Sequence, residues 1–249
     1  MSAMLLPAAR AEWTKFRSAR AMIWTTGVMA ALWPALSLVV ALTGSLPDDD
    51  TVLGGSLAGG VNAQVAAGVL GALCMTSEFR TGSIGPTLAA VPRRGRLLAA
   101  KAAVVSAVVL IVTIVMTPVA FGIGWLLLDR DVHPTGDPFP AIIGVGAVLV
   151  VTAVLGLALG AVLRHPAGSM VAIIGVLLLP SMVGPLFGDM ERWIGSASPT
   201  GVLVKLRQST EALHETTGSL GGWPSLGVVA AGTAGVLAGA IHRFSIRDV

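Results

Sequence analysis

Side chains capable of chemistry are scarce in this sequence, and many of them gather in one short stretch. Residues 78–94 read Glu-Phe-Arg-Thr-Gly-Ser-Ile-Gly-Pro-Thr-Leu-Ala-Ala-Val-Pro-Arg-Arg. Glu78 and Arg80 stand two residues apart, and Gly82 follows where a glycine permits a tight turn. Arginine carries a permanent charge and five N–H donors. We therefore expect Glu78 to be either an ion-pair partner that holds this segment or a contact for another protein, and Arg80 to be able to serve in both ways.

The same stretch carries an apolar ridge. Ile84, Leu88 and Val91 are spaced by four and then three residues, which places them on one face of a short helix. An apolar helix face of this kind suits a groove in a partner protein. Residues 76–96 are therefore a candidate docking loop. The alternative is a loop whose arginines act only as a signal for membrane topology.

Two further polar residues, Asn62 and Gln64, lie near the midpoint of an apolar run. Being two residues apart, they point to nearly opposite faces of a helix. Either residue lines a substrate path, or both form hydrogen bonds between neighbouring helices.

Several classes of chemistry are disfavoured by what the sequence lacks. The four histidines fall in loops or at the ends of apolar runs, and no Asp, Glu, Arg or His falls in the central part of any run. Ion-coupled transporters and intramembrane proteases usually need such groups. The sequence also has no Gly-x-x-x-x-Gly-Lys phosphate-binding loop. We expect no enzymatic activity, no metal and no cofactor in this chain.

The elements that position these residues are predicted to be membrane-spanning helices. Hydrophobic residues make up 54% of the chain and charged residues 12%, and the charges are segregated between long apolar runs. Six runs are long enough to cross a bilayer as helices. These are Ala21–Thr43, Val52–Met75, Leu97–Leu128, Phe139–Leu163, Ala167–Phe187 and Trp223–Ile241. The prediction is an all-α integral membrane protein with one transmembrane domain over residues 1–249.

The distribution of basic residues predicts the orientation. With a cytoplasmic N-terminus, only Arg130, Arg192, Lys205 and Arg207 of the 16 basic residues lie outside. The positive-inside rule therefore places both termini in the cytoplasm of a bacterial cell. Because the basic residues cluster between spans, the basic pI indicates topology rather than nucleic-acid binding. Lys101 is expected in first turns of the third helix that rise out of the docking loop.

Two flanking segments are predicted to have structure of their own. Residues 1–20 combine helically spaced Leu6, Ala9, Trp13 and Phe16 with basic neighbours, which favours an amphipathic interfacial helix over a plain basic tail. Residues 189–222 form the longest external segment, either a plain loop or a helical lid that dips into the membrane.

Stripes of small residues are typical of close helix packing. Three are spaced by four residues: Gly227, Ala231, Gly235 and Gly239; Gly55 and Gly59; Gly156 and Gly160. We expect them to pack within the bundle, with a subunit interface as the alternative.

Taken together, these motifs resemble the permeases of the type-2 ABC exporter family. The resemblance rests on Glu78-x-Arg80-x-Gly82-Ser83, Thr87-Leu88-Ala89, Pro92-Arg93-Arg94 and Lys101. The opening Glu12-Trp13-x-Lys15-Phe16-Arg17-Ser18-x-Arg20 is similar to that family's N-terminal elbow, and Phe244–Val249 is similar to its tail, with Ile246 where a second basic residue is common.

The resemblance implies a dimer of six-helix chains with two separate cytoplasmic ATPase subunits, which bind ATP and Mg²⁺. It also implies that the 76–96 loop forms a coupling helix seated in the ATPase, with Glu78, Arg80, Gly82, Ile84, Leu88 and Val91 at the contact, and that the 189–222 segment is re-entrant. Two other interpretations stay open. One is a secondary transporter or pore, and the other is a membrane scaffold or sensor partner that transports nothing.

Overall fold

The computed structural model describes residues 5–83, 85, 94–210, 212 and 218–246. Its six longest helices are α2 (Arg20–Thr43), α4 (Gly60–Thr81), α6 (Arg94–Leu127), α7 (Pro138–Leu163), α8 (Pro166–Val183) and α12 (Gly222–Ile246). Six spans in the described part of the chain, built on these helices, are long and apolar enough to cross a membrane. The described residues form helices and connections without strands. The prediction of an all-helical protein with six candidate spans is therefore confirmed.

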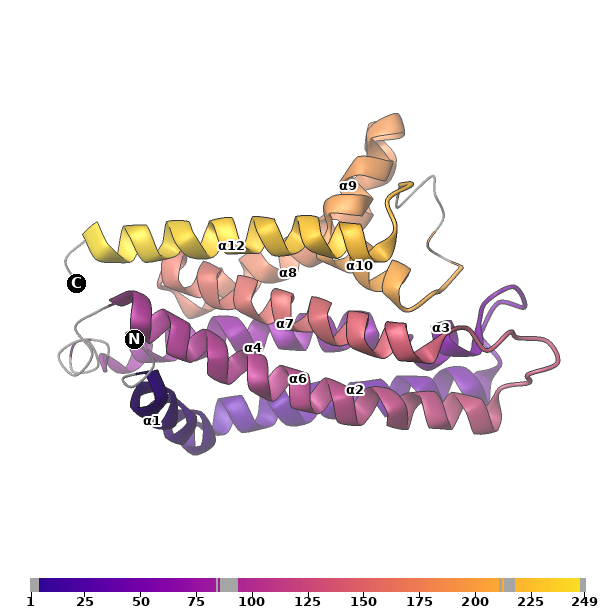
Figure 1. Ribbon diagram of the computed structural model, residues 1–249, viewed down its shortest axis with the longest axis horizontal. Helices are drawn as coiled ribbons and strands as arrows, with labels where there is room; N and C mark the ends of the chain where they lie inside the picture. The colour runs from indigo at the N-terminus through magenta and orange to yellow at the C-terminus, as the bar shows by residue number, and fades with distance from the viewer. Residues whose placement is uncertain (1–4, 84, 86–93, 211, 213–217, 247–249) are drawn as a thin grey trace.

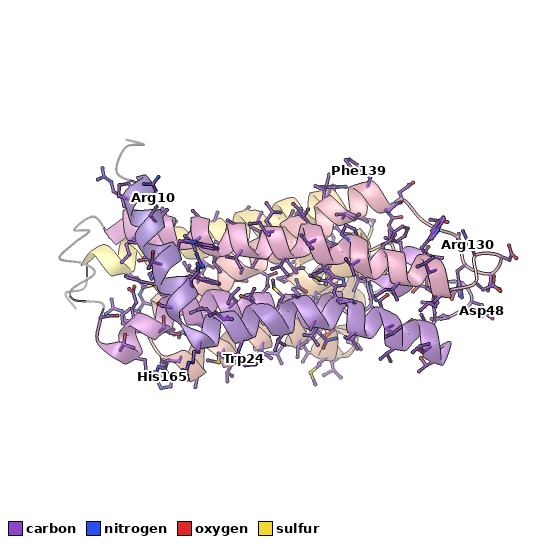
Figure 2. All side chains as sticks on the ribbon, turned by 90° about the horizontal axis from the view of Figure 1, so that it is seen from below. Arg10, Trp24, Asp48, Arg130, Phe139 and His165 are labelled. Carbon is purple, nitrogen blue, oxygen red and sulfur yellow. The ribbon has the colours of Figure 1, made fainter. Side chains whose placement is uncertain are left out.

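Five short helices complete the described elements. They are α1 (Leu5–Ser18), α3 (Val52–Ser56), the 3-10 helix η2 (Gly184–Met190), α9 (Glu191–Ala197) and α10 (Pro199–Leu206). Figures 1 and 2 show α1 lying across the long axis of the bundle at one end, and Figure 1 shows α9 projecting at the other. We call these the α1 end and the α9 end. The last turn of α12 also lies at the α1 end (Figure 1).

Helix α4 is the centre of the bundle, and its contact with α7 is the closest of the fold. A Cβ atom at Gly71 would lie 1.8 Å from the Ala153 carbonyl oxygen, and one at Gly156 would lie 2.0 Å from the Gly68 carbonyl oxygen. The two backbones therefore touch where glycine removes the side chain. In both spans 61% of the residues are buried, against 17% in the spans of α2 and α8.

The second predicted span differs from its expected boundaries. Val52–Met75 is divided into α3 and α4 by a turn at residues 57–59, and α4 continues past Met75 to Thr81. Gly54, Gly55, Gly59 and Gly60 make this part of the run a weak helix former. The helix ends where Gly82 adopts the left-handed conformation (φ +67°), which is the turn expected of this glycine.

The small-residue stripes divide into two groups. Gly156 and Gly160 are buried against α4, and Gly55 and Gly59 are buried against Leu46 and the α2 backbone. On α12, by contrast, a Cβ atom at Gly227, Gly235 or Gly239 would meet nothing within 4 Å. The expectation that the α12 stripe packs inside the one-chain bundle is wrong, because this face of the helix points outward.

Candidate functional site: a buried ion network at the α1 end

Helix α1 turns a carboxylate into the bundle. Glu12 and Phe16 are one helical turn apart, and both are buried, at 5% and 8% exposed. Phe16 joins the main hydrophobic core, together with Met22 of α2 and Leu97 and Leu98 of α6. This apolar anchoring holds the Glu12 carboxylate over the junction of α4 and α6.

Four charged side chains meet at that junction. The Lys101 ammonium of α6 donates to Glu12 Oε2 at 2.6 Å and to Glu78 Oε1 of α4 at 2.9 Å, and it also reaches the Cys74 carbonyl oxygen at 3.4 Å. Lys15 of α1 donates to Glu12 Oε1 at 3.0 Å and to Glu78 Oε1 at 2.7 Å. We call Glu12, Lys15, Glu78 and Lys101 the ion network. It joins three helices through two carboxylates and two ammonium groups.

The network is shielded from solvent on all but one side. Lys101 is 2% exposed and Glu78 is 4% exposed, whereas the Lys15 side chain is 44% exposed. Buried ion pairs of this kind do not by themselves add stability, but removal of one partner leaves an uncompensated charge. The network therefore fixes how α1, α4 and α6 meet more than it strengthens their contact.

One carboxylate oxygen of Glu78 takes no part in the ion network. Within the described part of the chain, the buried Glu78 Oε2 has no hydrogen-bond partner. A cavity of about 40 Å³ adjoins it, lined among others by Ser77, Cys74 and Phe16. This volume is large enough for a water molecule.

The network lies at the base of the predicted docking loop. Glu78 is in the last turn of α4, and Lys101 is two turns into α6. Of the two roles expected for Glu78, the structure shows the ion pair. Lys101 lies in the first turns of α6, which begins at Arg94, ahead of the predicted start of the span at Leu97. Its side chain is nevertheless buried, because Glu12 and Glu78 together compensate its charge.

The remaining predicted docking residues fall in two groups. Arg80 is exposed and has no polar partner among the described residues, and Gly82 is the C-cap of α4. Ile84, Leu88 and Val91 lie outside the described residues, so their apolar ridge stays a prediction.

The two polar residues of the second predicted span are separated by the fold. Gln64 is fully buried, and its Nε2 donates to Thr152 Oγ1 of α7 at 3.1 Å. Thr152 Oγ1 in turn donates to the Val148 carbonyl oxygen. Asn62 is exposed in the first turn of α4, not near the middle of a span, because the turn at residues 57–59 moves the start of the helix. Gln64 thus forms an interhelical bond, while Asn62 faces outward.

A second polar cluster, at the α9 end, was not anticipated from the sequence. The buried Asp50 carboxylate accepts hydrogen bonds from Ser209 Oγ at 3.0 Å and from the backbone N–H groups of Thr210 and Thr51 at 3.1 and 2.8 Å. The His133 ring hydrogen-bonds to the Asp50 carbonyl oxygen at 3.0 Å. We call this cluster, centred on Asp50, the loop clasp.

Gln208 reinforces the loop clasp. It adopts a positive φ of 57°, and its side chain bonds both the backbone N–H and the carbonyl of Asp137 at 2.9 Å. The clasp therefore joins three connections that are far apart in the sequence. Thr51 could have been recognised as a helix N-cap, which it is for α3, but no sequence signal pairs Asp50 with Ser209.

The described residues of the 189–222 segment include two unlike helices. Helix α10 is buried, with Leu203 beside Gly60 of α4 and Leu206 beside Gly144 of α7 and Gly222 of α12. Helix α9 projects from the bundle (Figure 1), and its Trp193 is 63% exposed. A buried helix between spans agrees with a lid that dips inward, while its place outside the cell stays a prediction.

Charged side chains lie at the two ends of the bundle. Figure 2 shows Arg10 and His165 at the α1 end and Asp48 and Arg130 at the α9 end. The described residues contain no cluster of three or more His, Cys, Asp or Glu side chains that could hold a metal ion. No protein-family model and no curated protein matches this chain.

Proposed function

We propose that this chain is the membrane-spanning permease subunit of an ATP-driven exporter in a bacterial plasma membrane, working as a dimer with a separate cytoplasmic ATP-binding subunit. The observation that carries the proposal is the ion network. It binds α1 to α4 and α6, the two helices on either side of residues 82–93, so these three elements form one unit. A partner that pushes on the loop would move this unit as a whole.

The packing of α4 would transmit such a displacement into the bundle. Helix α4 carries Glu78 at its end and packs against α2, α7 and α8. Its backbone touches that of α7 at Gly68 and Gly71. Close-packed backbones transmit displacement because no side chain between them can yield. Movement at Glu78 would therefore reach the middle of the bundle through α4.

The distribution of buried acids disfavours a secondary transporter. The buried carboxylates of the described residues are Glu12 and Glu78 at the α1 end and Asp50 at the α9 end. A proton-coupled carrier usually places such a group inside the membrane between the two ends. The energy source is then expected on another subunit, in agreement with the resemblance described above.

A co-purification experiment tests the proposal. We expect a P-loop ATPase to co-purify with the tagged chain from its native membrane and to be lost with Leu88→Asp, which places a charge in the apolar ridge. Val132→Asp is the matched control, because Val132 is an exposed apolar residue at the α9 end. Absence of any ATPase from the wild-type preparation, or its retention by Leu88→Asp, would refute the proposed coupling.

The energy source has a separate test. The purified chain alone should hydrolyse no ATP and should leave an imposed proton gradient across vesicles intact, as read by a pH-sensitive dye. Collapse of the gradient that depends on the chain would favour the secondary transporter or pore instead.

A further inference from the structure

In the first twenty residues, the fold buries the one acid and leaves the arginines exposed. In the sequence, Glu12 alternates with basic residues, and it is the only acid before Asp48. In the structure, Glu12 is buried and paired with Lys101 and Lys15. Arg10, Arg17 and Arg20 stay exposed, and the described residues offer no ion-pair partner to any of them. The outer side of this segment is therefore purely cationic.

These cations share their surface with exposed aromatic rings. Arg10, Trp13, Thr14 and Arg17 are spaced by three and four residues and lie on one face of α1. Trp13 is 42% exposed, with its ring stacked on Phe16 at a centroid distance of 6.2 Å. Trp24, at the beginning of α2, is 74% exposed. We call Arg10, Trp13, Arg17, Arg20 and Trp24 the basic face.

The position of the basic face matches the polar boundary of a bilayer. Helix α1 lies across the bundle axis (Figure 2). Arg20 opens the first candidate span. Indole rings favour the headgroup region of a membrane, and guanidinium groups pair with phosphate in a planar, bidentate geometry. Lys15 of the same helix belongs to the ion network, so a headgroup on the basic face would lie next to the network.

We infer that the basic face binds the headgroups of anionic phospholipids. The occupant follows from charge. Among the described residues, these three guanidinium groups have no ion-pair partner and no exposed acid beside them, and such a cluster selects a lipid with net negative charge over a zwitterionic one. The exposed tryptophans select a lipid rather than an acidic soluble protein, because indole rings at a span boundary partition into the headgroup region. The inference does not depend on the exporter function.

Lipid titration of the detergent-solubilised chain, read by native mass spectrometry, tests this inference. Phosphatidylglycerol should bind more tightly than phosphatidylcholine of the same acyl chains. Each arginine contributes about a fivefold factor in affinity. Arg10→Gln with Arg17→Gln should therefore weaken phosphatidylglycerol binding about 25-fold. Arg130→Gln with Arg192→Gln is the matched control, since both residues are exposed and remote from α1, and it should leave the affinity unchanged.

A gain-of-charge variant keeps the test valid if the double variant does not fold. Thr14 is exposed between Arg10 and Arg17, so Thr14→Arg should tighten phosphatidylglycerol binding about fivefold without changing phosphatidylcholine binding. Ser45→Arg, at the opposite end of α2, should have no such effect. Equal affinity for the two lipids in the wild-type chain, or equal gains from Thr14→Arg and Ser45→Arg, would overturn the inference.

Discussion

At the scale of single residues, Lys101 is the buried cation that compensates the two carboxylates at the α1 end. It is the only described side chain that joins Glu12 and Glu78 while being itself buried. Lys15 contacts the same two carboxylates from the half-exposed side. The two lysines therefore provide a comparison in which the two carboxylate partners are shared and the burial of the lysine differs.

Replacement of Lys101 by methionine should destabilise the protein strongly. Lys101→Met leaves two buried carboxylates without their inner cation, and breaking a buried pair in this way costs about 3–5 kcal/mol. Lys15→Met should cost much less, about 0–1 kcal/mol, because solvent compensates an exposed pair. Thermal unfolding in detergent measures both variants. Adding Glu78→Gln to Lys101→Met should recover part of the loss, and equal stability of the two single variants would show that burial is not the determining factor.

At the scale of helices, the contact between α4 and α7 depends on glycine. A Cβ atom added at these glycines would clash with backbone atoms of the partner helix, as at Gly71 with Ala153 and at Gly156 with Gly68. Neither backbone can move without disturbing its own helix. The outward-facing glycines of α12 lack any such neighbour.

Gly156→Ala should therefore destabilise the protein, whereas Gly235→Ala should not. The added methyl group at position 156 overpacks a backbone contact, at a cost of about 1–3 kcal/mol. At position 235 the methyl group meets no atom, and alanine is a better helix former than glycine by about 0.8–1.0 kcal/mol. Thermal midpoints of the two variants in detergent should thus shift in opposite directions. A lower thermal midpoint for Gly235→Ala that appears only in a dimeric preparation would instead place α12 in a subunit interface.

The loop clasp is the second feature at this scale, and Asp50 is its acceptor. Asp50→Ala leaves three donors without their carboxylate, which costs about 1–3 kcal/mol locally. Amide hydrogen exchange at residues 208–210 should accelerate about tenfold. Asp49→Ala is the control, since the neighbouring Asp49 is exposed. Similar exchange in both variants would mean that α10 is held by its apolar contacts alone.

At the scale of the whole molecule, the charges of the bundle predict its direction in the membrane. The α1 end carries Arg10, Lys15, Arg17 and Arg20, which the positive-inside rule assigns to the cytoplasm. With this orientation, the connections after the first, third and fifth spans, which form the loop clasp, are predicted to lie outside the cell.

Cysteine labelling tests this orientation. After Cys74→Ala, single cysteines at the exposed positions Asp49, Asp131 and Ser219 should react with an impermeant thiol reagent in intact cells, whereas one at the exposed Ser18 should react only after permeabilisation. Labelling of Ser18→Cys but not Asp49→Cys in intact cells would reverse the assigned direction.

The sequence alone determined the helical class, the six candidate spans and the turn at Gly82. These are local properties, since the length of an apolar run and the conformational freedom of one glycine do not depend on distant residues. It also indicated that Glu78 is either an ion-pair partner or a docking contact.

Only the tertiary structure decided which partners these residues have. Glu12 meets Lys101 across 89 residues of chain, and Asp50 meets Ser209 across 159. The tertiary structure also decided which way each helix face points. The α12 stripe points outward and Glu12 points inward, although both follow ordinary helical spacing. A helical period states which residues share a face, but the neighbour that covers this face is chosen by the packing of the whole bundle.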